Sequence, residues 1–346
     1  MAFALNCPLP NASGVIQMAH GGGGRVMREL LEQLLLPAFG NPALDRRHDS
    51  AVLAVGSSRL AFSTDTYVVQ PRVFPGGDIG RLAVYGTVND LAAAGATPLF
   101  LSCALILEEG LPISELQRLV QAMAAAAAEC GVQIVTGDTK VVDRGKGDGL
   151  FINSAGIGLV PAGVDIGPHA VRPGDAVLLS GDLGRHGIAV LSVREGLAFE
   201  TPVASDCGPV LPLVQALLAG NIEVHCLRDP TRGGLAAVLN EIALDRGVAI
   251  EVREPAIPVL DAVRGACELL GLDPLYVACE GRLVAFVPEP QADRSLAVMR
   301  AAPGGAGACR IGRVGAEGRG QVWVATALGT RRVLDLLSGE QLPRIC

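Results

Sequence analysis

The sequence predicts a mixed α/β fold that is divided into two domains. Its 346 residues suffice for two domains of usual size, and half of them are hydrophobic, so a large buried core is available. Strand-like and helix-like patterns alternate on both sides of a turn at Arg172-Pro173-Gly174-Asp175. This alternation permits two related α+β domains, although no sequence repeat is evident. By itself it would also allow a doubly wound sheet.

We divide the chain into an N-terminal segment (1–43), a first domain (44–168), a second domain (169–335) and a flexible tail (336–346). In the N-terminal segment, His20 precedes the glycine run Gly21, Gly22, Gly23 and Gly24, and a helical apolar spacing follows up to Pro37. Consecutive glycines cannot hold one conformation unaided. They form either a plain linker or, because they meet a helix N-terminus, a loop that covers an anion with its backbone N–H groups.

In the first domain, apolar alternation on both sides of residues 56–58 predicts a hairpin, and Asp78 is placed to cap a helix that ends at Gly95. A second helix begins at the capping box Ser114-x-x-Gln117 and ends at Gly131. Strands are predicted at 51–55, 59–63, 98–107, 132–136 and 150–160. In the second domain we expect strands at 176–180, 248–252, 283–287 and 321–325, and helices at 211–218, 233–245 and 259–270.

Composition excludes several classes of partner and location. The net charge is −7 and no basic block offsets it, so neither nucleic acid nor an anionic membrane is an expected partner. The sequence has no apolar run of membrane-spanning length and no signal-peptide pattern at its start. The nine cysteines are scattered, without a C-x-x-C pair or histidine spacing for zinc. We therefore expect a cytosolic protein with reduced thiols.

Acidic residues stand where predicted elements end, at Asp49, Asp65, Asp90 and Asp138. Any one of them is more often a cap or turn former than a ligand. Asp90, however, falls inside a predicted helix, where an Asn-Asp pair has poor helix propensity and indicates a function. Converging carboxylates would need a cation between them, and hard oxygen ligands suit Mg²⁺, which usually accompanies phosphates. Lys140 could neutralise such phosphates.

Two stretches of the second domain carry further candidates. Arg228-Asp229-Pro230-Thr231-Arg232-Gly233-Gly234 joins a short strand to a helix that Thr231 would cap; a capped turn does not explain two arginines beside an acid. Glu280 stands alone between apolar stretches. It is either a buried carboxylate with a raised pKa, able to take a proton near neutrality, or a half-exposed turn residue. The sequence has neither a P-loop nor a G-x-G-x-x-G turn, so a nucleotide would need another scaffold.

The sequence ends with Leu342-Pro343-Arg344-Ile345-Cys346. A glycine upstream can release the chain from regular structure, and a proline stiffens the approach to the thiol. Such a tail could carry a sulfur into a pocket some distance from the fold. Alternatively, the segment frays and its cysteine is incidental.

Taken together, these motifs resemble the HypE family of hydrogenase maturation proteins. The resemblance extends from about residue 16 to 346 and rests on His20–Gly24, Pro75–Gly80, Gly86–Asp90, Gly137–Val142, Arg228–Gly234 and Pro343–Cys346. It implies a two-domain fold like that of aminoimidazole ribonucleotide synthetase, with a homodimer paired through the first domain. It also implies an ATP-dependent dehydratase that converts an S-carbamoyl group on its own terminal cysteine to a thiocyanate. The carbamoyltransferase HypF would supply that group, and a HypC–HypD complex would receive the cyanide for [NiFe] hydrogenase.

The resemblance assigns roles to the candidate residues. It implies that Cys346 carries the substrate, that Lys140 offsets charge on the transferred phosphoryl group and that Glu280 accepts a proton. The metal ligands for Mg²⁺ would be Asp65, Asp90 and Asp138, with Asp49 as a weaker candidate. The contacts to ATP would come from His20, Gly21, Gly22, Gly23, Gly24, Asn89, Lys140 and Asp229.

Departures from the family pattern and two other functions remain open. Cys279 stands where asparagine is expected and Arg282 where lysine is commoner, so a polar partner of Glu280 could be lost. Thr66-Tyr67 replaces Ser-Phe and keeps the hydroxyl. A small-molecule kinase or synthetase on the same scaffold would need no terminal cysteine, and a non-catalytic thiol carrier would need neither Lys140 nor the aspartates.

Overall fold

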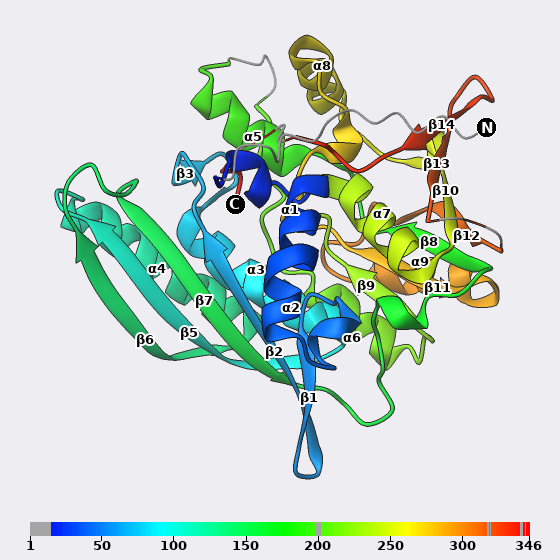
Figure 1. Cartoon of the computed structure of the whole chain (residues 1–346), viewed down its shortest axis with the longest axis horizontal. Helices are drawn as coiled ribbons and strands as arrows, with labels where there is room; N and C mark the ends of the chain where they lie inside the picture. Colours follow the sequence, from blue (N-terminus) through cyan, green and yellow to red (C-terminus); the bar gives the residue numbers. More distant parts are fainter. Residues whose placement is uncertain (1–14, 198–201, 317, 319, 340–341, 343) are drawn as a thin grey trace.

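The computed structural model describes residues 15–197, 202–316, 318, 320–339, 342 and 344–346, which form two large β-sheets and one short hairpin (Figure 1). Each large sheet is built from one half of the chain, and most strand pairs are antiparallel. The predicted mixed α/β fold is therefore confirmed, and the doubly wound alternative is wrong. Among the helices of these residues, none combines the length and the hydropathy that a transmembrane segment requires.

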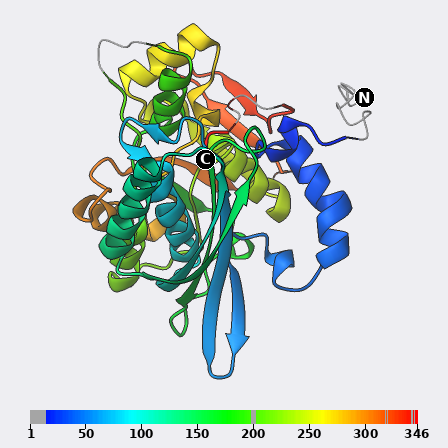
Figure 2. The same ribbon diagram turned by 90° about the vertical axis from the view of Figure 1, so that its left-hand side faces the viewer.

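The first sheet has the strand order β1-β2-β7-β5-β6 and carries helices α3 and α4 on one side (Figure 2). Only β5 and β6 are parallel. A short hairpin of β3 (Val73–Phe74) and β4 (Gly77–Asp78) precedes α3. The other elements are β1 (Ala51–Val55), β2 (Ser58–Tyr67), α3 (Ile79–Ala93), β5 (Thr97–Glu108), α4 (Ile113–Cys130), β6 (Gln133–Val142) and β7 (Leu150–Leu159).

Helix α3 is the central element of the protein because it lies between the first sheet and the second domain. The Asp78 side chain accepts a hydrogen bond from the backbone N–H of Arg81 at 3.0 Å, which confirms the predicted cap. Nearly all side chains of α3 are buried, as expected for a helix that is apolar all round. Helix α4 ends at Gly131 in the left-handed conformation (φ 68°), as predicted. It begins at Ile113, however, so Ser114 lies inside its first turn and the predicted capping box is wrong.

The second sheet has the order β14-β13-β10-β12-β8-β11-β9. Strand β8, which lies between β12 and β11, is buried along its whole length. Helix α7 has Gly233 at its N-cap with φ 75°, so the predicted cap by Thr231 is wrong. The elements are β8 (Asp175–Leu179), α5 (Arg185–Arg194), α6 (Leu211–Ala219), β9 (Cys226–Arg228), α7 (Gly234–Arg246), β10 (Ala249–Arg253), α8 (Asp261–Leu270), β11 (Val284–Pro288), α9 (Ala292–Ala301), β12 (Cys309–Gly315), β13 (Val322–Ala325) and β14 (Arg331–Leu334).

The two ends of the chain pack against this framework. The predicted N-terminal helix is confirmed and consists of α1 (Arg25–Leu30), a π-helical stretch (Leu31–Leu35) and α2 (Leu36–Phe39). An ion pair of 2.7 Å between Arg28 and Asp245 attaches it to α7. At the other end, the side chain of Ile345 is buried in a hydrophobic cluster shared by both domains. The tail residues that the structure describes are therefore seated on the fold.

Candidate active site

A cavity of about 440 Å³ lies where the N-terminal helix, both domains and the end of the chain meet. It is lined by apolar side chains of α1 and the π-helical stretch, by charged side chains of both domains and by Cys346. Of the predicted site residues, the lining includes Gly23, Gly24, Asp49, Asp65, Asp90, Asp229, Glu280 and Cys346. The fold thus collects candidates that lie far apart in the sequence around one space.

Three carboxylates converge at this cavity: Asp49 before β1, Asp90 in the last turn of α3 and Asp229 after β9. One oxygen of each lies within 4.8 Å of the others. Arg228 Nε contacts Asp49 Oδ1 at 2.6 Å, and Ser63 Oγ donates to Asp90 Oδ2 at 2.6 Å. Asp49 Oδ2 is buried and forms no hydrogen bond with any residue that the structure describes. The site therefore has an open oxygen ligand.

The electrostatics of this triad favour a cation. Burial raises the pKa of Asp49 to about 8 and that of Asp229 to about 6, and it raises the pKa of Asp90 well above its usual value. Mutual repulsion of the carboxylates adds to the shift, whereas Arg228 opposes it at Asp49 and Asp229. Such carboxylates either take up protons or bind a cation, and an all-oxygen ligand set suits Mg²⁺. The residues present therefore fit this ion.

Asp65 lies next to the triad but outside it. It also lines the cavity, and burial raises its pKa while Arg232 opposes the shift. The family resemblance predicts Asp65 as a metal ligand and Asp229 as a nucleotide contact. The geometry instead makes Asp229 the third member of the triad, with Asp65 as a neighbour.

Asp138 does not join these acids in the protomer, contrary to the sequence-based prediction. Strand register places Asp65, Ser154, Cys103 and Gly137 in one row across the first sheet. Because successive side chains of a strand point to opposite faces, Asp138 projects from the face opposite to that of Asp65. Lys140, two residues further along β6, lies on the same face as Asp138 and pairs with it at 2.7 Å. Neither residue lines the cavity, and both are exposed.

Two glycines of the run, Gly23 and Gly24, border the cavity. Gly23 has φ 72°, and a side chain there would come within 2.7 Å of the Arg232 carbonyl oxygen. A side chain at Gly24 would overlap the carbonyl oxygen of Leu337. Gly21 and Gly22 line an adjoining cavity of about 300 Å³, which shares Arg232 and Cys346 with the first. Glycine is therefore required where this loop touches its neighbours.

Two predicted nucleotide contacts are engaged elsewhere. The His20 ring accepts from the backbone N–H of Gln17 at 3.0 Å, within its own short helix. The buried side chain of Asn89 donates to the Gly208 carbonyl oxygen at 3.1 Å and accepts from the Val210 N–H at 2.8 Å. Asn89 therefore joins α3 to the loop before α6 and lies outside the cavity lining.

Glu280 is buried, with 3% of its surface exposed, so it is not the half-exposed turn residue that the sequence also allowed. Burial raises its pKa well above the usual value; Asp229, Asp65 and Asp206 add to the shift, and Arg232 opposes it. Its Oε1 atom forms no hydrogen bond with the described part of the chain. A buried, unpartnered carboxylate of this kind can accept a proton near neutral pH.

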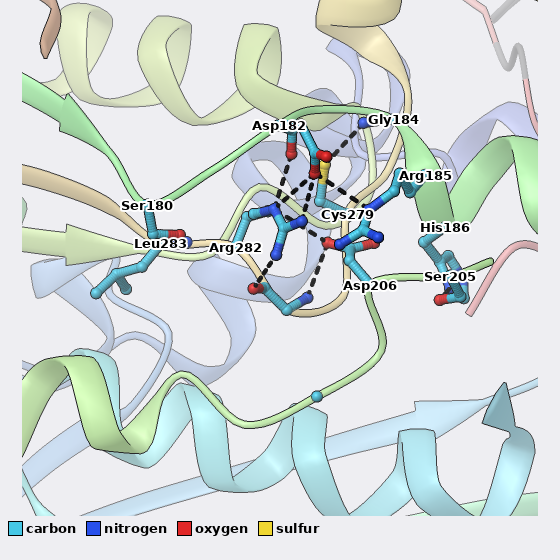
Figure 3. Close-up of polar contacts among 12 residues, drawn as sticks. Ser180, Asp182, Gly184, Arg185, His186, Ser205, Asp206, Cys279, Arg282 and Leu283 are labelled. Atoms are coloured by element: carbon cyan, nitrogen blue, oxygen red, sulfur yellow. Dashed lines mark hydrogen bonds and ion pairs between the residues drawn. The ribbon is translucent and has the colours of Figure 1, made fainter. Parts of the chain in front are cut away.

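The loop around Glu280 is held by its neighbours, and the cysteine at 279 does not disturb it (Figure 3). Cys279 Sγ accepts from the Gly184 N–H at 3.2 Å, and Cys279 lies outside the cavity lining. Asp206 accepts from the Gly281 N–H at 3.2 Å, and the Glu280 carbonyl oxygen accepts from the Gly208 N–H at 3.2 Å. These contacts fix the backbone of Glu280 without a polar side chain at 279.

Cys346 lines the same cavity as Glu280 and the triad, so the end of the chain is packed against the fold. Burial raises the pKa of its thiol; Glu280 adds to the shift and Arg232 opposes it. Arg232 is a cavity residue to which sequence reasoning gave no role, although its place beside an acid in Arg228–Gly234 was a signal. The site thus joins a seated thiol, a buried carboxylate and a potential cation site.

Comparison with known proteins identifies the family to which this chain belongs. Residues 47–160 match the N-terminal domain and residues 172–325 the C-terminal domain of the family described as AIR synthase related protein. Carbamoyl dehydratase HypE of Cupriavidus necator is 54% identical over 98% of this chain and 97% of its own length.

Solved structures give the same result. The crystal structure of hydrogenase maturation protein HypE in complex with ATP is 49% identical, covers 96% of this chain and 100% of its own, and superposes with a TM-score of 0.81. The chain in the crystal structure of a HypE–HypF complex is 43% identical, with 89% and 99% coverage and a TM-score of 0.84. The chain therefore belongs to the HypE family of hydrogenase maturation proteins.

Proposed function

We propose that this protein is an ATP-dependent carbamoyl dehydratase that acts on an S-carbamoyl group carried by its own Cys346. The observation that carries the proposal is that Cys346, Glu280 and the carboxylate triad line one cavity. The product is a thiocyanate on Cys346, which supplies the cyanide ligand of [NiFe] hydrogenase. Relatives of about half identity over nearly their whole length are named carbamoyl dehydratases, which supports the same activity.

The reaction removes one water from the carbamoyl group. The carbonyl oxygen is a poor leaving group, so it first accepts the γ-phosphoryl group of ATP, with release of ADP. The nitrogen then loses its protons as the C–O bond breaks, phosphate leaves and the C≡N bond forms. Glu280 is placed to accept one of these protons because its carboxylate is unpartnered and lines the cavity with Cys346.

Asp49, Asp90 and Asp229 would hold Mg²⁺, with Asp65 beside them. The ion would neutralise charge on the phosphates of ATP. Gly23 and Gly24 let the loop approach closely without side chains, and Arg232 places a cation at the thiol end of the cavity. The apolar side chains of Met27, Leu31 and Leu36 also line the cavity.

Lys140 and Asp138 enter this scheme only through a dimer. They project from the uncovered face of the first sheet, where apolar side chains are exposed at Leu53, Val55, Phe62, Phe100, Ile106 and Leu159. Exposed apolar sheet faces of this kind commonly form protein interfaces. We infer a homodimer paired through this face, in which Lys140 offsets the charge of the transferred phosphoryl group. HypF as carbamoyl donor, the HypC–HypD complex as acceptor and a cytoplasmic location belong to the same proposal.

Intact-mass measurement of the protein after incubation with HypF, carbamoyl phosphate and ATP tests the function. We expect carbamoylation of Cys346 followed by ATP-dependent loss of one water. The Glu280→Gln variant should be carbamoylated yet lose water at least 100-fold more slowly, since general-base catalysis typically contributes about 10²–10⁴-fold. Glu289→Gln is the matched control, because that glutamate is exposed, pairs with Arg310 and lies outside the cavity lining. Carbamoylation without water loss in the unaltered protein would support a carrier, and no modification would support a small-molecule kinase.

A further inference from the structure

The last residues of the chain occupy a seat formed by both domains. The backbone N–H groups of Val68 and Gln70 donate to the carbonyl oxygens of Cys346 and Arg344 at 3.0 and 3.3 Å. The two segments run antiparallel, since one partner number rises as the other falls. The carbonyl oxygen of Ile345, the residue between Arg344 and Cys346, takes no part in these two bonds. That oxygen therefore needs another donor.

His186 of α5 provides this donor. Its Nε2 atom lies 2.7 Å from the Ile345 carbonyl oxygen, and its Nδ1 atom lies 2.9 Å from Ser205 Oγ. The His186 side chain is fully buried, and Phe74 packs edge-on against its ring at a centroid distance of 5.2 Å. His186 and Ser205 lie side by side in Figure 3.

The hydrogen-bond partners determine which ring nitrogen carries the proton. A carbonyl oxygen can only accept, so Nε2 is protonated and donates to Ile345. Nδ1 is then the acceptor, and the Ser205 hydroxyl donates to it while accepting from the Cys207 N–H at 2.9 Å. The ring is neutral in this arrangement, and burial lowers the pKa of His186, which keeps it neutral.

The segment that orients His186 also holds Glu280. Ser205 contacts the histidine, Asp206 accepts from the Gly281 N–H, and the Gly208 N–H donates to the Glu280 carbonyl oxygen at 3.2 Å. One short stretch, residues 205–208, thus fixes both the tail donor and the loop of the buried carboxylate. The position of the Ile345 backbone relative to Glu280 is set through this stretch.

We propose that His186 is a positioning residue that fixes the register in which the tail docks and so brings Cys346 to Glu280. A slip of the tail by one residue would move the Ile345 carbonyl oxygen away from His186 Nε2 and would turn the Ile345 side chain out of the core. Because these hydrogen bonds are made to backbone groups of the tail, His186 bonds the Ile345 carbonyl oxygen whether the Cys346 thiol is free or carries a carbamoyl group. The link to Glu280 rests on the proposed function; the seat itself does not.

Labelling of Cys346 with N-ethylmaleimide tests the seat without ATP or a carbamoyl donor. The full-length protein is labelled at fixed pH, and each cysteine is followed by peptide mass spectrometry. His186→Leu removes the donor at similar volume, so we expect Cys346 to be labelled about tenfold faster, the effect of losing one buried hydrogen bond. His186→Gln keeps an N–H donor and should stay within about threefold of the unaltered protein.

Half-buried Cys130 and Cys309, outside the seat, are internal controls for general loosening of the fold. The proposal is overturned if His186→Leu leaves the labelling rate of Cys346 unchanged, or if all three cysteines accelerate together. It is also overturned if His186→Gln behaves like His186→Leu. Faster labelling in His186→Leu combined with no dehydration by the unaltered protein would leave the seat intact and refute only the proposed function.

Discussion

Replacement of Asp90 by asparagine should stabilise the protein in the absence of divalent cations while abolishing its ATP-dependent reaction. Asp90 lies within 4.8 Å of Asp49 and Asp229, and the structure shows Ser63 as the donor that an amide could equally accept from. The substitution keeps size and shape and removes one negative charge. A change in the free energy of unfolding of this variant therefore reports the repulsion among the three carboxylates.

The expected gain follows from this geometry. At 4.8 Å and an effective dielectric constant of about 20, two full negative charges repel by about 3.5 kcal/mol. Protonation of Asp90 sets an upper limit on this destabilisation. Keeping a carboxyl group with a usual pKa of 3.8 protonated at pH 7 requires about 4.4 kcal/mol, so repulsion cannot cost more than that. A raised folded-state pKa means that stability falls as pH rises through the range above 3.8. The Asp90→Asn substitution removes this loss, so we expect a gain of about 2 kcal/mol at pH 7, and not more than about 4.

Urea unfolding in EDTA and in excess Mg²⁺, at pH 7, measures both effects. The unaltered protein should gain stability from Mg²⁺, whereas Asp90→Asn should gain much less and should not dehydrate carbamoylated Cys346. Asp335→Asn is the matched control, because that carboxylate is exposed and lies outside the cavity lining; its unfolding free energy should change by less than about 0.5 kcal/mol. A loss of stability in EDTA for Asp90→Asn, or full stabilisation of that variant by Mg²⁺, would refute the triad as a cation site.

Two further predictions concern the proton acceptor and the glycine loop. Glu280 must be ionised to accept a proton, and the charge of Asp206 raises its pKa. The Asp206→Asn substitution should therefore move the acidic limb of the pH profile for water loss to lower pH. An unchanged or upward-shifted limb in single-turnover measurements would contradict the assignment. Gly24→Ala should lower the free energy of unfolding in urea by about 1–3 kcal/mol and weaken ATP binding, because the added methyl group meets a backbone carbonyl oxygen. Gly21→Ala should have neither effect, because its methyl group meets nothing within 4 Å. Equal effects of the two alanines would show that the loop does not pack as described.

Much of the fold could be predicted from local patterns. Apolar alternation predicted the hairpin of β1 and β2, and spacing with caps predicted α3 from Asp78 and the end of α4 at Gly131. These features depend on residues a few positions apart, which a sequence displays directly. The caps proposed at Ser114 and Thr231 were wrong because tertiary packing moved the helix starts by a few residues.

The sequence by itself determined which residue types are available for chemistry: the cysteine at its end, Glu280 between apolar stretches, and aspartates at the ends of elements. Only the tertiary structure decided which of them meet. Asp65 and Asp138 were indistinguishable as ligands until strand register placed them on opposite faces of one sheet. Asp229 entered the triad, and His186 met the tail, through contacts between residues far apart in the chain. Such contacts depend on how sheets and helices pack, and no local pattern encodes that packing.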